Sequence, residues 1–198
     1  MSHPFARQDS RSHNRYLPRL PRPFYQADST VHWILTTHGR VPLGLNDPLH
    51  LQFREILLHA CCRHHLLCPA YCLMPDHIHL VWIGLHPSSD QLNAMAFLRT
   101  HLSRAIAPAR FQHQAYDSVY RESHGNVDTL RRWIEYAVLN PVMDDQTAHP
   151  EVWPWMGSVV PGIPRIHPLE GRFWELFGRL HHDRRDPACD RHVRPMLV

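Results

Sequence analysis

The sequence predicts a small α+β domain in which strands and helices alternate along the chain. Three observations lead to this fold class. The length of 198 residues suits one domain, hydrophobic residues make up 43% of the chain, and strand-like and helix-like periodicities follow one another. The apolar runs are too short to cross a membrane, and the N-terminus has no apolar segment resembling a signal peptide. We therefore expect a folded cytoplasmic protein.

Periodicity predicts the elements of the first half. The β-branched and aromatic run at 30–37 predicts a strand. Apolar residues at helical spacing predict a helix over 47–60. Two further strands are predicted at 69–73 and 77–83, and the proline in segment 74–76 separates them because it interrupts the hydrogen-bond ladder.

The second half contains three further predicted elements outside its central helix. The run Ser88-Ser89-Asp90 is predicted to cap a helix with apolar positions from 92 to 102. Residues 111–121 are expected to be extended. A Pro- and Trp-rich loop then precedes an amphipathic helix over 170–182.

A helix with an uninterrupted apolar stripe lies between these elements. Its predicted cap is Asn126 or Asp128, and it is expected to stop near Asn140 because Pro141 disfavours helix in the preceding residue. The stripe that should face the core consists of Leu130, Trp133, Ile134, Ala137 and Val138.

The charge of the chain divides it into three parts. The net charge is +3, all 21 basic residues are Arg, and five of them lie in residues 1–24. We expect a basic flexible arm at 1–24, a folded catalytic domain at 25–160, and an amphipathic helix with a basic tail at 161–198. Basic arms suit a nucleic-acid partner, but they also serve solubility, and charge alone leaves both open.

Four of the five cysteines lie close together in the sequence, as Cys61, Cys62, Cys68 and Cys72. A zinc site is one interpretation of this group. Small buried apolar residues are the other, and the absence of a CxxC pair favours it.

The segment MPDHIHL places His77 and His79 two residues apart on a predicted strand. Alternate strand residues face the same side, so both imidazoles should reach one metal ion. Two alternatives remain: polar residues facing water, and a histidine-triad nucleotide hydrolase. Val81 stands where the third histidine of such a triad would be, and this argues against the hydrolase.

Tyr136 lies on the predicted central helix but outside its apolar stripe. At about 100° per residue it is roughly 120° from the centre of that stripe. It shares its face with Arg132 and Asn140, which are four residues away on either side. The face has the composition of a functional surface, although an ordinary amphipathic helix with a half-exposed tyrosine is the alternative.

Four segments taken together resemble a known family. MPDHIHL, QAYDSVYRE, YAVLNPV and WPWMGS, in this order and spacing, resemble the motifs of single-tyrosine HUH transposases. The most similar branch is the REP-associated tyrosine transposases, which are linked to short palindromic repeats in bacterial genomes. The resemblance covers roughly residues 25–160. It implies a ferredoxin-like antiparallel sheet with helices packed on one face.

The resemblance also implies an activity and a site. His77 and His79 would bind a divalent metal, Mg²⁺ or Mn²⁺, with Asn140 completing the site, and Tyr136 would be the nucleophile. The implied reaction is cleavage and rejoining of single-stranded DNA near palindromic hairpins through a 5′-phosphotyrosine. Such a protein would be a nucleoid-associated monomer or homodimer without a membrane partner. Candidate contacts to the DNA backbone are Arg99, Arg104, Arg131 and Arg132.

Some residues depart from the family pattern. Asp76 stands where relatives have Asn, and the acidic pair Asp144 and Asp145 would repel DNA if it faced it. A palindrome-binding protein without catalytic activity is therefore an alternative, as is a histidine-dependent nucleotide hydrolase. Trp153 and Trp155 either stack on bases or pack their loop onto the core.

Overall fold

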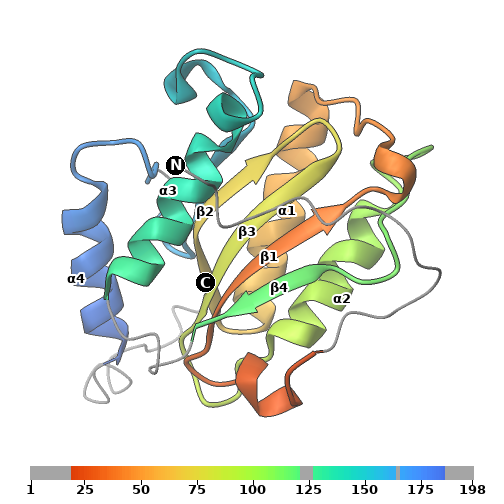
Figure 1. The fold of residues 1–198 in the computed structure, drawn as a ribbon. Coiled ribbons are helices and arrows are strands. Elements are labelled where there is room, and N and C mark those ends of the chain that lie inside the picture. Colours follow the sequence, from red (N-terminus) through yellow and green to blue (C-terminus); the bar gives the residue numbers. More distant parts are fainter. Residues whose placement is uncertain (1–18, 121–126, 164–165, 186–198) are drawn as a thin grey trace, which may run out of the picture.

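The computed structural model describes residues 19–120, 127–163 and 166–185. They form a five-stranded antiparallel sheet in the order β4-β1-β3-β2-β5, with helices on both faces (Figure 1). The predicted α+β class is confirmed. The strands are β1 (Thr30–Thr36), β2 (Leu66–Leu73), β3 (His77–Gly84), β4 (Tyr116–Val119) and β5 (Met156–Val159).

Four α-helices and three short 3₁₀ helices complete the described fold. The α-helices are α1 (Asp47–Arg63), α2 (Gln91–Leu102), α3 (Val127–Met143) and α4 (Phe173–Arg185). The 3₁₀ helices are η1 (Arg22–Tyr25), η2 (His38–Arg40) and η4 (Pro150–Val152). None of the helices in the described ranges is long and apolar enough to span a membrane.

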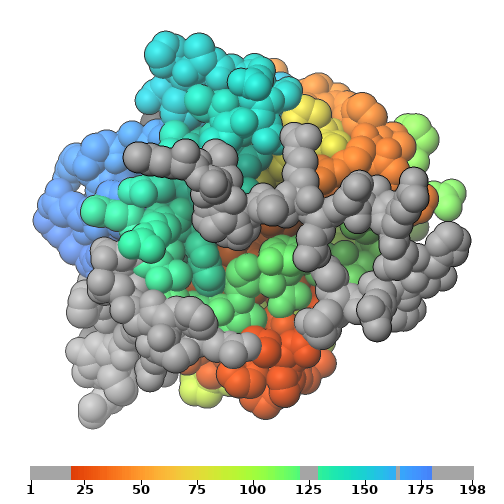
Figure 2. Space-filling model, viewed as in Figure 1, coloured from red at the N-terminus to blue at the C-terminus, as the bar shows by residue number. Residues whose placement is uncertain are grey.

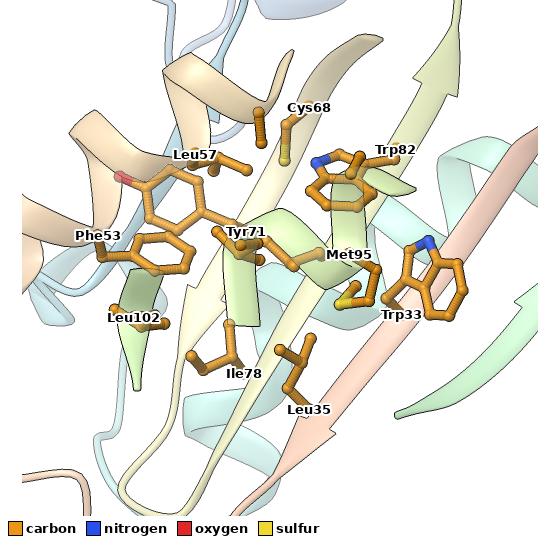
Figure 3. Packing of buried hydrophobic residues seen from close by; sticks show 14 of the residues in the cluster. Trp33, Leu35, Phe53, Leu57, Cys68, Tyr71, Ile78, Trp82, Met95 and Leu102 are labelled. Carbon is orange, nitrogen blue, oxygen red and sulfur yellow. The ribbon is translucent and has the colours of Figure 1, made fainter. Parts of the chain in front are cut away.

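Strand alternation divides the interior into two cores. Side chains such as Trp33 and Trp82 point to one face and pack against α1 and α2 (Figure 3). Val81 and Ile83 point to the other face and pack against α3 and α4. The expectation of helices on a single face is therefore wrong, because both faces of this sheet are apolar and both are covered.

A bulge in β2 changes which way its side chains point. The pairing of β2 with β3 shifts register between Leu67 and Ala70, around Pro69, which has no N–H to donate. A one-residue shift moves later side chains to the opposite face. Cys68 consequently faces the first core and Cys72 the second.

The bulge and the burial of the thiols decide between the two interpretations of the cysteines. Cys61, Cys68 and Cys72 are buried free thiols, and Cys62 is exposed. No three His, Cys, Asp or Glu side chains converge in the part of the chain that the structure describes. The zinc interpretation is wrong, and the buried cysteines are packing residues.

Helix α3 continues through Pro141 to Met143, so the expected end near Asn140 is too early. Pro141 lacks the N–H that would bond the carbonyl of Ala137, but the ladder resumes directly after it. The N–H of Asp144 donates to the Asn140 carbonyl at 2.9 Å. Asn140 is thus held in regular helix, one turn after Tyr136. Of the two expected caps, Asn126 lies outside the described residues and Asp128 lies inside the helix.

Three further expectations can be compared with the fold. The extended segment at 111–121 contains β4, and the last helix lies at 173–185 rather than 170–182. The Pro- and Trp-rich loop contains an unexpected edge strand, β5, which pairs with β2. Of the expected arm, residues 1–18 lie outside the described ranges.

The two tryptophans of that loop pack onto the protein. Trp153 donates its indole N–H to the Leu73 carbonyl at 3.0 Å and contacts the second core. Trp155 packs against the first core and lies edge-on to His50. The packing interpretation is confirmed for both side chains.

Candidate active site

His77 and His79 occupy the first half of β3 and face α3. Their Nε2 atoms are 3.1 Å apart. Thr36 and Ile34 of β1 lie opposite them in the sheet. The prediction that the two imidazoles point to the same side is confirmed, and their Nε2 atoms meet beneath the C-terminal half of α3.

Asn140 brings a third possible metal-ligand atom to the same point. Its Oδ1 lies 3.2 Å from the Nε2 of His77, and the residue is only 3% exposed. Two ligands at about 2.1 Å from an ion and at right angles to one another are about 3.0 Å apart. The separations of 3.1 and 3.2 Å therefore fit ligands arranged around one divalent cation.

The protonation of the site is also suited to a cation. Burial lowers the pKa of His79 well below its ordinary value, and the neighbouring His32 and His77 lower it further. A neutral imidazole is the form that binds metals. In the described residues the third candidate ligand is an amide oxygen, not a third His, Cys, Asp or Glu.

The Nδ1 atom of each imidazole, which points away from the candidate metal site, is also hydrogen-bonded. Nδ1 of His77 donates to Oδ1 of Asp76 at 2.7 Å, and Arg40 donates to the other carboxylate oxygen at 3.2 Å. Burial alone would raise the pKa of Asp76, but these two partners lower it. Partners of this kind fix the ring orientation and the tautomer of a metal-binding histidine.

For His79 the partner is another histidine, His32 of β1. Its Nε2 lies 3.1 Å from Nδ1 of His79, and the two rings are stacked with their centroids 5.3 Å apart. Burial lowers the pKa of His32 to about 4, so the ring is neutral and can accept a hydrogen bond. With Nε2 of His79 available for a metal, its Nδ1 carries the proton and donates to His32.

His32 was not predicted to be a site residue. The residue stands in the strand-like run 30–37, but its position beside His79 depends on how β1 pairs with β3. The available signal in the sequence was a histidine within a β-branched and aromatic run; that it is only 5% exposed is known from the structure.

Tyr136 lies next to the histidines in the same chain. Its ring centroid is 5.4 Å from that of His79 and 5.8 Å from that of His32. Its side chain is 38% exposed, as expected for a residue outside the apolar stripe, and it hydrogen-bonds Asn140. One chain therefore brings together the predicted metal ligands and the predicted nucleophile.

The Tyr136 phenol is neutral near pH 7. Burial raises its pKa above the ordinary value of 10.0, the charge of Asp144 adds to this, and the hydrogen bond from Asn140 opposes it. Asp144, Asp145 and Asp76 line a cavity of about 390 Å³ beside the site, with Arg40 as the basic residue on its wall.

Residues of α3 and β4 near the candidate site are partly exposed. In Figure 2 the green atoms of β4 lie beside the blue-green atoms of α3, and Tyr120 and Trp133 bring their rings to 6.4 Å. Tyr116 of β4 is 48% exposed. Tyr136, with 38% of its surface exposed, can therefore be reached from solvent.

The four candidate DNA-binding arginines are not brought together. Arg99 lies on α2 and Arg104 directly after it, on one side of the sheet, whereas Arg131 and Arg132 lie on α3 on the other. Arg131 has its guanidinium 4.9 Å from the Trp174 ring centroid and its Nε 3.9 Å from Glu135. Arg132 is exposed.

Comparisons with solved structures show the same fold. A REP-associated tyrosine transposase bound to a REP hairpin is 16% identical, with a TM-score of 0.58, and the match covers 74% of this chain and 82% of that one. A Deinococcus radiodurans protein described as a candidate transposase is also 16% identical, but its TM-score of 0.39 carries no weight, although the match covers 65% of this chain and 98% of that one. No curated protein matches.

The sequence itself matches a family model. The model describes IS200-like transposases and matches residues 25–135, more than half of the chain. The matched segment contains the histidines of β1 and β3 and ends one residue before Tyr136. From this match and the arrangement of its sheet, the chain belongs to the family of IS200-like transposases.

Proposed function

We propose that this protein is a metal-dependent transposase that cleaves and rejoins single-stranded DNA near palindromic hairpins through a 5′-phosphotyrosine at Tyr136. The observation that carries the proposal is the approach of the Tyr136 ring to His79, 5.4 Å between centroids, beside three converging donor atoms. A structural neighbour whose own structure contains a REP hairpin supports hairpin DNA as the partner.

The residues of the chain have defined parts in the proposed reaction. His77, His79 and Asn140 would hold the cation, which supplies Lewis-acid chemistry by offsetting the charge on a non-bridging oxygen of the scissile phosphate. Mg²⁺ prefers oxygen ligands to imidazoles, so we expect Mn²⁺ to work at least as well. The hydrogen bond from Asn140 to Tyr136 ties the nucleophile to the same helix face as a candidate ligand.

The covalent step exchanges one phosphate ester for another. The Tyr136 oxygen forms a bond to phosphorus while the bond from phosphorus to the 3′ oxygen breaks. The phenol gives up its proton and the released 3′ oxygen takes one, which leaves a 3′-hydroxyl and a 5′-phosphotyrosine. Because the ester is conserved, attack by another 3′-hydroxyl restores the DNA without ATP and returns Tyr136.

Covalent trapping tests the proposal. The full chain is incubated with Mn²⁺ and a labelled hairpin oligonucleotide with single-stranded flanks, and adducts are resolved on a denaturing gel. We expect an adduct that requires Mn²⁺ and is lost in Tyr136→Phe. Tyr116→Phe is the matched control, because it removes a hydroxyl from a nearby exposed ring and should retain the adduct. An adduct that persists in Tyr136→Phe contradicts the proposal.

One observation favours a second candidate, a palindrome-binding protein that does not cut. The cavity beside Tyr136 contains three carboxylates, from Asp76, Asp144 and Asp145, which oppose the approach of a phosphate. This candidate predicts that the hairpin binds equally well with EDTA and in Tyr136→Phe, and that the wild-type chain forms no adduct.

A further inference from the structure

The surface near the catalytic residues is poorly suited to hold a DNA backbone. Its cavity of about 390 Å³ has the three carboxylates of Asp76, Asp144 and Asp145 against the single guanidinium of Arg40. Affinity for nucleic acid comes largely from cations that neutralise phosphates. The chain must therefore find most of its backbone affinity at another surface.

A segment on the other side of the sheet has a positive charge. Residues 91–116, which form α2 and the connection to β4, contain Arg99, Arg104 and Arg110 and no Asp or Glu. Arg104 and Arg110 are exposed and form no ion pair with an acid in the described parts of the chain. This segment, between Asp90 and Asp117, is therefore positively charged, and its exposed guanidiniums are available to an anionic partner.

A cavity of about 470 Å³ lies against α2 and the connection to β4. Arg19 and Arg99 line it together with Thr100, His113 and Gln114. No acidic residue lines it. Guanidinium, hydroxyl, imidazole and amide groups around one hollow are suited to the oxygens of a phosphate.

Both guanidiniums of this cavity are held in place before any ligand arrives. Arg99 lies 5.7 Å from the Phe111 ring centroid and donates to the Gln112 carbonyl. Arg19 lies 5.4 Å from the Trp33 ring centroid and donates to the Ala115 carbonyl at 3.3 Å. An arginine whose plane is fixed loses less freedom when it binds a phosphate.

The two cations also act on each other. Burial lowers the pKa of Arg99, and the positive charge of Arg19 lowers it further. Asp117 pairs with Arg19 at 3.3 Å but no acid pairs with Arg99 in the described residues, so the pair keeps an excess positive charge. A bound anion would relieve this repulsion.

We propose that the Arg19–Arg99 cavity binds a phosphodiester of the DNA on which Tyr136 acts, and that Arg104 and Arg110 extend this contact along the backbone. The identity of the anion as DNA rests on the proposed function. The cavity lies at the β4 edge of the sheet, because His113 and Gln114 directly precede β4. β4 is two strands from β3, or about 10 Å across the sheet, so a strand of DNA passing over this edge can reach both sites.

Binding as a function of salt tests the proposal. Fluorescence anisotropy of a labelled hairpin oligonucleotide with single-stranded flanks is measured with the full chain, in EDTA, over a range of NaCl concentrations. The double variant Arg19→Gln/Arg99→Gln should lower the magnitude of the slope of log K against log salt by about 0.7, because the cavity neutralises one phosphate of a single strand. The same relation gives a roughly 5-fold loss of affinity at about 0.1 M salt.

Two other variants control for charge and folding. Arg54→Gln removes one charge from a partly buried guanidinium that donates to Tyr71 at 3.2 Å and does not line the cavity, and it should leave the slope unchanged. Arg99→Lys keeps the charge without the forked geometry, so it should weaken binding but keep the slope. Arg99→Lys also provides a result if the double variant does not fold.

The outcomes separate this proposal from the proposed function. The slope and affinity of the double variant matching wild type would overturn the anchoring site, even if Tyr136 adducts form. A smaller salt slope in the double variant, together with adduct formation at saturating DNA, supports the anchoring site. A wild-type chain that never forms an adduct, yet binds DNA through the two arginines, contradicts the proposed function alone. If inorganic phosphate binds in an Arg99-dependent way and the hairpin does not, the cavity is a small-anion site and the proposal is wrong.

Discussion

Replacing His32 by leucine should weaken metal binding without touching a predicted ligand. His32 accepts the Nδ1–H of His79 across 3.1 Å, in a place where the two residues are 5% and 1% exposed. The metal-binding tautomer of His79 requires this proton on Nδ1. Leucine offers no hydrogen-bond acceptor, and water has little access to the Nδ1–H of His79.

The size of the effect follows from that burial. A buried donor without a partner costs about 1–3 kcal/mol. Loss of the partner behind a metal-binding histidine typically costs about 10- to 100-fold in metal affinity, which corresponds to about 1.4–2.8 kcal/mol. We therefore expect the Kd for Mn²⁺ to rise by about 10- to 100-fold.

Calorimetric titration of the full chain with Mn²⁺ measures this change. His32→Gln restores an acceptor oxygen and should recover part of the affinity. His50→Leu is the matched control, because it removes a half-buried imidazole that contacts Tyr71 at 2.9 Å on the other face of the sheet. A Kd in His32→Leu equal to that of wild type, with the fold intact by urea unfolding, would refute the reasoning.

Three other changes have directions fixed by the structure. Asp76→Ala removes the acceptor behind His77 and should weaken Mn²⁺ binding about tenfold by calorimetry, while Asp76→Asn keeps an acceptor and should weaken it less. Gly84→Ala would place its Cβ 1.7 Å from the backbone oxygen of Ala27, so urea unfolding should show a loss of about 3 kcal/mol. Asp90→Ala removes the cap of α2 and should cost about 1 kcal/mol at neutral pH.

The pH dependence of the last change has a definite sign. Burial would raise the pKa of Asp90, but its hydrogen bond from Asn93 and its contacts with Arg22 and Gln26 bring the pKa below its ordinary value. The stabilisation is therefore present above the unfolded value of about 3.9 and is lost as pH falls through the folded value. The difference in the free energy of unfolding between wild type and Asp90→Ala should become smaller in acid. A difference that stays constant with pH would contradict this account.

Equal unfolding midpoints for wild type and Gly84→Ala would show that the Ala27 segment can move. Equal Mn²⁺ affinities for Asp76→Ala and wild type would show that the His77 ring is held by other contacts.

Local sequence patterns were enough to predict those site residues that lie together on one strand or one helix. Strand alternation places His77 and His79 on one side, and the helical repeat places Tyr136 outside the apolar stripe. Both depend on neighbours within a few residues. The position of Asn140 one turn after Tyr136 follows from the same repeat, although its burial does not, because burial depends on what α3 packs against.

Features that depend on distant pairing were missed. His32 reaches His79 through the β1–β3 register, which no local pattern contains. The strand β5 has only four residues and gains its structure by pairing with β2. The bulge around Pro69, which sends Cys68 and Cys72 to opposite faces, also exists only in the paired sheet. Helix α3 passes Pro141 because packing outweighs the local preference of the preceding residue.

The placement of Tyr136 beside histidines of its own chain has a kinetic consequence. If Tyr136 is the nucleophile proposed above, the rate of the first cleavage per protein molecule at saturating DNA should be independent of protein concentration, since one chain brings Tyr136, His79 and Asn140 together. Dilution would then slow only those later events that require a second tyrosine.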